Sequence, residues 1–266
     1  MSDRADGRDS TVIPVARQEW PDPLERLRAR TPARVFLGRC GAALPTRALL
    51  AFQLAHARAR DAVCDEFEPQ RVAALLPNHD VRIVHSRALD RQTYLQRPDL
   101  GRRLDDSSAA SLPRGDYEAV FVIADGLSAR AVHEHAASTL AATLPKLPGW
   151  RLGPVVVSCR ARVALGDEIG ERLGARLAVV LIGERPGLSA PDSLGAYLTW
   201  QPRVGRLDSE RNCISNIRPP VGLAYEQAAV RIAWLMNTAR RLRLSGIALK
   251  EESGAARGIS QPTTSG

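Results

Sequence analysis

The chain has 266 residues, enough for one large domain or two smaller ones with a sizeable buried core. Hydrophobic residues make up 44% and charged residues 25% of the sequence, as in ordinary globular proteins, and no apolar run approaches the roughly 20 residues that span a bilayer. The polar start MSDRADGRDS excludes a secretory signal, so we expect a cytoplasmic protein without a membrane segment.

The net charge of +8 raises the question of nucleic-acid binding. All but two of the 37 basic residues are arginine, and they are spread along the chain between acidic residues. Nucleic-acid-binding modules concentrate their charge in a stripe or a recognisable motif, so this pattern favours ion pairs instead, including pairs between subunits. The cysteines lie far apart, which indicates reduced thiols rather than a disulfide framework or a zinc site. They are Cys40, Cys64, Cys159 and Cys213.

The first part of the chain is expected to be mainly helical. Residues 1–19 lack periodicity and predict a disordered tail. Helices are predicted over 22–30, 46–63 and 68–76, the second of them capped by Thr46. Residues 82–86 alternate between apolar and polar and favour an edge strand.

The stretch 91–104, RQTYLQRPDLGRRL, is rich in arginine. One interpretation is a solvated, ion-paired surface, and the other is a docking surface for a partner or an anionic group.

From about residue 117 apolar strands alternate with helices, which implies a parallel sheet with right-handed crossovers. The strands are predicted at 119–124, 155–158 and 177–183, and the helices at 128–144, 167–175 and 225–244. We therefore predict an α/β protein whose Rossmann-like three-layer domain has a mainly parallel sheet and follows a small helical domain. The predicted domains are a helical domain at 20–112 and the Rossmann-like domain at 113–252, with disordered tails at 1–19 and 253–266.

Three loops follow the predicted strands, and the carboxyl ends of parallel strands meet at one edge of a sheet, where ligands bind. The loops begin at Asp125, Cys159 and Gly183. The last opens GERPGLSAPDSLGAYLTW, whose glycines and prolines are typical of a pocket rim. Residues 125–128 have two interpretations: backbone N–H groups that bind an anionic or carbonyl-rich ligand, or a plain turn capped by Ser128.

A self-contained catalytic set is missing from these motifs. The chain lacks G-x-G-x-x-G, G-x-x-x-x-G-K-[ST], G-x-S-x-G and H-E-x-x-H, which argues against a nucleotide-dependent enzyme that acts alone. His133 and His135 are two residues apart on a helix and make a poor metal pair. Cys213, as a lone thiol, is interpreted as a small packed residue rather than a nucleophile. We predict no catalytic residue and no metal site on this chain.

Five segments, taken together, resemble the small subunits of ethanolamine ammonia-lyase, in the order and spacing of that family. The resemblance covers roughly residues 20–250. The sequence departs from the family pattern within 38–56. It has GRCGAALP where the family has GRAGPRP, and Ala55-His56 where the family has Asp-His. The segments are TYLQRPDLGRRL (93–104), ADGLSA (124–129), RVALGDEIGERLGA (162–175), GERPGLSAPDSLGAYLTW (183–200) and CISNIRP (213–219).

The resemblance implies an adenosylcobalamin-dependent lyase that converts ethanolamine to acetaldehyde and ammonia by a radical mechanism, following cobalt–carbon homolysis. It also implies a hetero-oligomer in which a large catalytic (β/α)8-barrel subunit and this chain hold the cobalamin between them. The family's cobalamin contacts correspond to Val163, Glu184 and Cys213. Glu184 would accept hydrogen bonds from amide or hydroxyl groups, and the other two would give apolar or backbone contacts. The sequence leaves open whether the complex occupies the free cytosol or a bacterial microcompartment.

Overall fold

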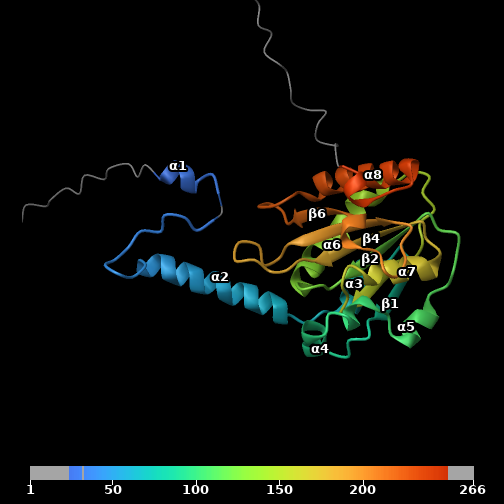
Figure 1. Ribbon diagram of the computed structural model, residues 1–266, viewed down its shortest axis with the longest axis horizontal. Helices are drawn as coiled ribbons and strands as arrows, with labels where there is room; N and C mark the ends of the chain where they lie inside the picture. Colours follow the sequence, from blue (N-terminus) through green and yellow to red (C-terminus); the bar gives the residue numbers. More distant parts are fainter. Residues whose placement is uncertain (1–23, 32, 251–266) are drawn as a thin grey trace, which may run out of the picture. The chain divides into compact units, whose positions relative to one another are not determined.

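A computed structural model of the chain describes residues 24–31 and 33–250 (Figure 1). The disordered tails predicted at 1–19 and 253–266 lie outside the described residues. The chain divides into two compact units, Met1–Leu49 and Leu50–Gly266. In the first unit the structure describes α1 (Glu25–Arg28), within the predicted helix 22–30, and a short bridge between Cys40 and Ala43.

The predicted helices after residue 45 are confirmed. The helix α2 (Thr46–Cys64) begins in the first unit and continues into the second, and α3 (Pro69–Ala74) starts at a proline, whose missing N–H costs nothing in the first turn. The arginine-rich stretch contains α4 (Arg91–Gln96), where the Asp90 carboxylate accepts a hydrogen bond from the Thr93 N–H. A 3-10 turn (Leu100–Arg102) and α5 (Asp106–Ser111) follow.

A mixed sheet of six strands in the order β1-β3-β2-β4-β5-β6 forms the centre of the second unit. The first four strands in this order are parallel, and β5 and β6 are antiparallel to their neighbours. The mainly parallel sheet of the prediction is therefore parallel in only one part. The strands are β1 (Val81–His85), β2 (Ala119–Ala124), β3 (Val155–Cys159), β4 (Leu177–Gly183), β5 (Leu194–Trp200) and β6 (Arg211–Ile217).

The antiparallel part has a simple cause. A parallel neighbour needs a crossover of a dozen or more residues, usually with a helix, whereas β4 and β5 are joined by only residues 184–193. The chain must therefore turn back beside β4, and Gly183 pairs with Leu194. The strand β1 lies within the range 20–112 that the sequence assigns to a helical domain, and it pairs with β3. The sheet therefore contains strands from both predicted domains, 20–112 and 113–252.

Helices pack against both faces of the sheet. On one face, α6 (Ala129–Thr143) and α8 (Tyr225–Leu242) contact each other and cover one apolar core. On the other face, α7 (Leu165–Leu173) covers a second core and ends at Gly174, whose φ of +76° gives the left-handed helix stop. Every residue of β2, β3 and β4 is buried, as expected for strands with helices on both sides. Within the described residues, no helix is long and apolar enough to cross a membrane.

Candidate functional site

The three predicted loops do meet at the carboxyl edge of the parallel strands. Asp125 accepts a hydrogen bond from the Ala161 N–H at 2.8 Å, which joins the loop after β2 to the loop after β3. The Leu127 N–H donates to the Gly183 carbonyl at 2.9 Å, which joins the first loop to the end of β4. A Cβ at Gly126 would lie 2.2 Å from that carbonyl oxygen, so only glycine permits the contact.

The turn at 125–128 is a structural turn rather than an open anion site. Its Gly126 N–H bonds to the Asp125 side chain and its Leu127 N–H to Gly183, while the Ser128 hydroxyl caps α6 at Ala131. Asp125 is 2% exposed, and this burial raises the pKa of its carboxyl to about 6 despite the N–H donors and Arg91 nearby. The capped-turn interpretation therefore accounts for these residues.

Glu184, directly after β4, has its carboxylate fixed by three donors. The hydroxyls of Ser193 and Ser215 donate to it, the latter at 2.7 Å, and the Asn216 N–H donates at 3.2 Å. Two of these donors come from a β-bulge in β6, where Ser215 and Asn216 together face Gly195 of β5, and Asn216 has a φ of +62°. The bulge turns both groups toward Glu184.

Cys213 lies on β6, close enough to Glu184 for the carboxylate to affect its thiol. It pairs with Tyr197 across the β5–β6 ladder, and the two side chains hydrogen-bond. Cys213 is exposed as a residue, but partial loss of hydration around its sulfur raises the pKa of the thiol. The Tyr197 hydroxyl opposes this rise, and the Glu184 carboxylate adds to it. The thiol is therefore protonated at neutral pH, which argues against a nucleophile, but Cys213 is exposed and not the small packed residue that the sequence predicts.

Val163 lies in the turn before α7 and lines a cavity of about 280 Å³ together with Arg211. Side chains alternate along a strand, so Arg211, Cys213 and Ser215 share one face of β6, along about 14 Å of strand. Val163 therefore lies near the first end of this row, Cys213 in its middle and Glu184 at its other end. We call this surface, with Tyr197, Cys213 and Ser215 at its centre, the β5–β6 face.

The β5–β6 face is open because the helices lie elsewhere. The strand β6 buries Ile214 and Ile217 on the opposite face, in the core under α6 and α8. Cys213 and Ser215, in contrast, are exposed. Sequence reasoning missed the residues that support Glu184 and Cys213, because no local pattern marks them. They are Ser193, Gly195, Tyr197, Ser215 and Asn216.

A buried ion pair attaches β6 to α7. The Arg211 Nη1 atom lies 2.6 Å from both carboxylate oxygens of Asp167 and 3.2 Å from the Thr199 hydroxyl oxygen. Its Nη2 donates to the Arg206 carbonyl at 2.8 Å. The Arg211 and Asp167 side chains are only 3% and 2% exposed, so the pair fixes β6 where the row of site residues begins.

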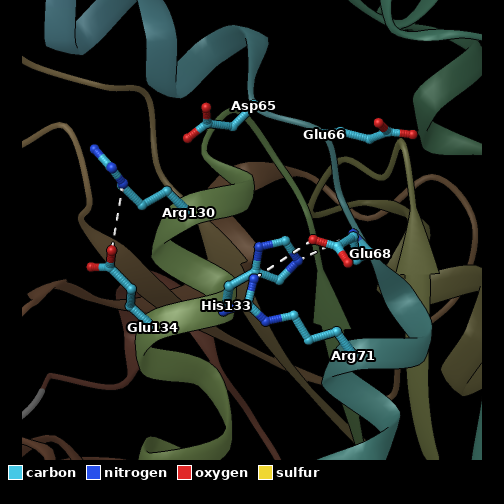
Figure 2. Close-up of a pocket in the computed structure, with 7 residues that line it drawn as sticks. All are labelled: Asp65, Glu66, Glu68, Arg71, Arg130, His133 and Glu134. Carbon is cyan, nitrogen blue, oxygen red and sulfur yellow. Dashed lines mark hydrogen bonds and ion pairs between the residues drawn. The ribbon is translucent and has the colours of Figure 1, made fainter.

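A second hollow, of about 390 Å³, lies between α3 and α6 (Figure 2). His133 projects into it and its Nε2 accepts a hydrogen bond from the Glu68 N–H at 3.1 Å, while its ring stacks on Phe67. His135, two residues on, bonds instead to Tyr225. The two histidines therefore face different surroundings, as their spacing of two residues on one helix predicts.

Comparison with known proteins identifies the family. The sequence profile described as "Ethanolamine ammonia-lyase light chain (EutC)" matches residues 21–250. A protein of Ralstonia nicotianae named "Ethanolamine ammonia-lyase small subunit" is 51% identical, over 92% of this chain and 93% of its own. Proteins with the same name from Azotobacter vinelandii and Bradyrhizobium diazoefficiens are 53% and 54% identical, over 89% and 87% of this chain and 91% of each of theirs. The chain therefore belongs to the family of ethanolamine ammonia-lyase light chains, the small subunits of that lyase.

Proposed function

We propose that this chain binds adenosylcobalamin on the β5–β6 face and holds it against the large subunit of ethanolamine ammonia-lyase, with Val163, Glu184 and Cys213 as contacts. The observation that carries the proposal is their arrangement. Three residues from separate motifs, 50 positions apart at the extremes, follow one another along β6: Val163 near Arg211 at one end, Cys213 in the middle and Glu184 beside Ser215 at the other end. On this proposal, the domain predicted to begin at residue 113 also includes β1, and the sheet with its helices forms a Rossmann-like, three-layer cobalamin-binding domain that is extended by the two antiparallel strands.

The residues of the β5–β6 face fit this cofactor. A corrin presents a wide plane rimmed with amides, and its nucleotide tail carries hydroxyl groups, so it needs an open surface with neutral groups and hydrogen-bond acceptors. The face supplies the exposed Cys213 and Ser215, the Tyr197 ring and a carboxylate already held in place. Gly195 has no side chain, and this leaves room for the Glu184 carboxylate, because a Cβ at this position would lie 2.8 Å from the Glu184 Oε1 atom.

This chain's part in the reaction is to bind and orient the cofactor. When bound, adenosylcobalamin supplies the radical chemistry that acts on ethanolamine. At the β5–β6 face, the Cys213 thiol stays protonated. The Glu184 carboxylate accepts three hydrogen bonds from its own chain, which leaves an acceptor position on Oε1 for the cofactor. Neither is suited to move a proton, so the groups that act on ethanolamine belong to the large subunit.

We further propose that α2 contributes to contact with the large subunit. From Leu50 onward it buries only Ala62, while Leu50, Phe52 and Leu54 are 58%, 41% and 53% exposed. Exposed apolar side chains grouped in this way are typical of an interaction surface. Phe52→Asp combined with Leu54→Asp should abolish co-purification with the large subunit, and full recovery of the complex would exclude α2 from the contact.

The cofactor proposal is tested by Glu184→Gln in the complex co-expressed with the large subunit. Loss of a charged acceptor costs about 1.5–3 kcal/mol, so adenosylcobalamin should bind roughly 10- to 150-fold more weakly in a titration followed by its absorbance. Glu226→Gln, at an exposed carboxylate on α8, is the matched control and should bind like the wild type. Equal affinity of all three proteins would remove Glu184 from the site, and turnover of ethanolamine by this chain alone would refute the division of roles.

A further inference from the structure

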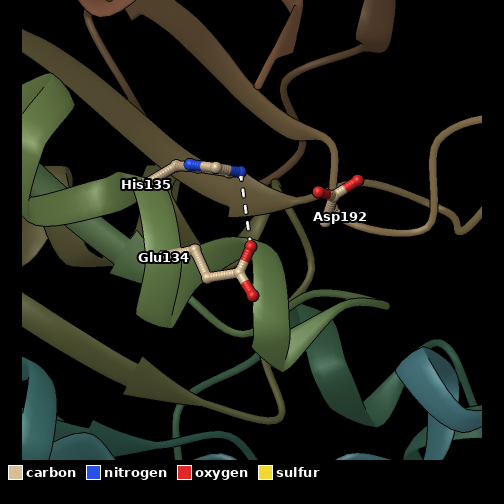
Figure 3. A group of neighbouring side chains, drawn as sticks. All are labelled: Glu134, His135 and Asp192. Atoms are coloured by element: carbon tan, nitrogen blue, oxygen red, sulfur yellow. Dashed lines mark ion pairs between the residues drawn. The ribbon is translucent and has the colours of Figure 1, made fainter. Parts of the chain in front are cut away.

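Three side chains that commonly bind metal ions converge between α6 and the loop before β5 (Figure 3). Glu134 and His135 are consecutive on α6, and Asp192 lies in the loop before β5. One ligand atom from each lies within 4.8 Å of the others. Acidic groups often gather on a protein surface without a ligand, so the decisive residue is the buried histidine.

His135 is 5% exposed, and its Nε2 atom has no hydrogen-bond partner among the described residues. Its other nitrogen, Nδ1, lies 2.8 Å from the Tyr225 hydroxyl oxygen. In the tautomer whose Nδ1–H donates to that hydroxyl, Nε2 is the unprotonated nitrogen. This tautomer leaves a free lone pair on Nε2, directed toward the carboxylates.

The His135 Nε2 and Glu134 Oε2 atoms lie 3.8 Å apart, which is too long for a hydrogen bond. A buried lone pair that faces two carboxylates without a hydrogen bond costs free energy unless a cation lies between them.

Two arginines flank the cluster but leave an oxygen of each carboxylate available. Arg130 contacts Oε1 of Glu134 at 3.4 Å, and Arg218 contacts Oδ1 of Asp192, with Nε at 2.8 Å. Outer residues of this kind orient the ligands of a metal site. The Oε2 and Oδ2 atoms, with the imidazole nitrogen, then form a ligand set of one nitrogen and two oxygens.

We propose that Glu134, His135 and Asp192 bind a divalent transition-metal ion, Zn²⁺ by preference, as a structural site. Zinc takes imidazole and carboxylate ligands at about 2.0–2.2 Å, which places tetrahedral ligand atoms roughly 3.4 Å apart. Rotation of the half-exposed Glu134 side chain closes the remaining gap. The ion would join α6 to the loop between β4 and β5. Ser193, which follows Asp192 in this loop, donates its hydroxyl hydrogen to the Glu184 carboxylate.

The test uses the complex with the large subunit, stripped with a chelator, dialysed against Zn²⁺ and assayed for zinc by mass spectrometry. The wild type should hold one zinc per small subunit that His135→Gln and Asp192→Asn lose, or bind at least 10-fold more weakly. His133→Gln, a histidine on the same helix whose Nε2 is already occupied, is the control and should keep the zinc. Zinc bound to cysteines should be present equally in the wild type and the three variants, so it does not affect the difference in zinc content between them.

A wild type that takes up no more zinc than Asp192→Asn would overturn the proposal, as would an equal loss in His133→Gln. Zinc should also raise the melting temperature of the wild type and not that of the two variants. If His135→Gln fails to assemble, Glu134→Gln replaces it, because that side chain is 48% exposed and its loss leaves the core intact.

Discussion

Replacing Arg211 by methionine should destabilise the protein strongly, because it leaves the buried Asp167 carboxylate without its cation. The guanidinium makes two contacts of 2.6 Å to this carboxylate, and the pair is almost fully removed from water. Breaking a buried ion pair at one partner costs about 3–5 kcal/mol. For a folded unit of about 200 residues this corresponds to a fall in melting temperature of roughly 6–20 °C.

The assay is thermal unfolding followed by circular dichroism, with Arg151→Met as the matched control. Arg151 also pairs with an aspartate, Asp116 at 3.1 Å, but the side chains are 54% and 78% exposed, so its loss should cost less than about 1 kcal/mol. The double variant Arg211→Met/Asp167→Leu removes both charges and should recover most of the stability. Equal small losses in Arg211→Met and Arg151→Met would refute the reasoning that burial sets the cost.

Two further changes test the site and the sheet edge. Gly195→Ala places a Cβ 2.8 Å from Glu184 Oε1 and 3.1 Å from the Tyr197 ring. Titration with adenosylcobalamin should therefore show about 10-fold weaker binding. The control is Gly187→Ala, whose added Cβ would have no neighbouring atom closer than 4.0 Å, and it should bind the cofactor normally. Asp125 has a folded-state pKa of about 6, above its ordinary 3.8, so its own contribution to the free energy of unfolding should fall by roughly 2.4 kcal/mol as the pH rises from 4 to 7. Asp125→Asn should lack this loss in urea titrations, and an identical pH dependence in both proteins would contradict the assignment.

The buried core of the fold could be predicted because its signals are local. The runs AVFVIA, VVVS and LAVVLIG are continuous and apolar, and each forms a strand buried on both faces. The strands β5 and β6 were not predicted as strands. In β6, polar residues and the bulge at Ser215 and Asn216 interrupt the alternation, and one face is open, so no continuous apolar run marks it.

The long-range contacts of the site were beyond reach of the sequence for a different reason. Arg211 and Asp167 are 44 residues apart, and Ser215 and Glu184 are 31 apart. Nothing in the charge pattern distinguishes Arg211 from the chain's other arginines. Arg211 becomes a buried partner rather than a surface cation only because β6 lies beside β5 and α7 packs on the side of the sheet to which Arg211 points. The resemblance to the family supplied Val163, Glu184 and Cys213 but not the groups that hold them.

The open face of β5 and β6 follows from how these strands are connected. A parallel strand is reached through a crossover, and the crossover helix then covers a face of the sheet. The strands β5 and β6 are reached through loops instead, so their addition widens the sheet without adding a helix on the α7 side. The bulge in β6 then directs Ser215 and Asn216 at Glu184, the first residue after the last parallel strand. A sheet extended in this way has an uncovered surface that could accept a wide, flat ligand, whereas a sheet covered by helices on both faces has none.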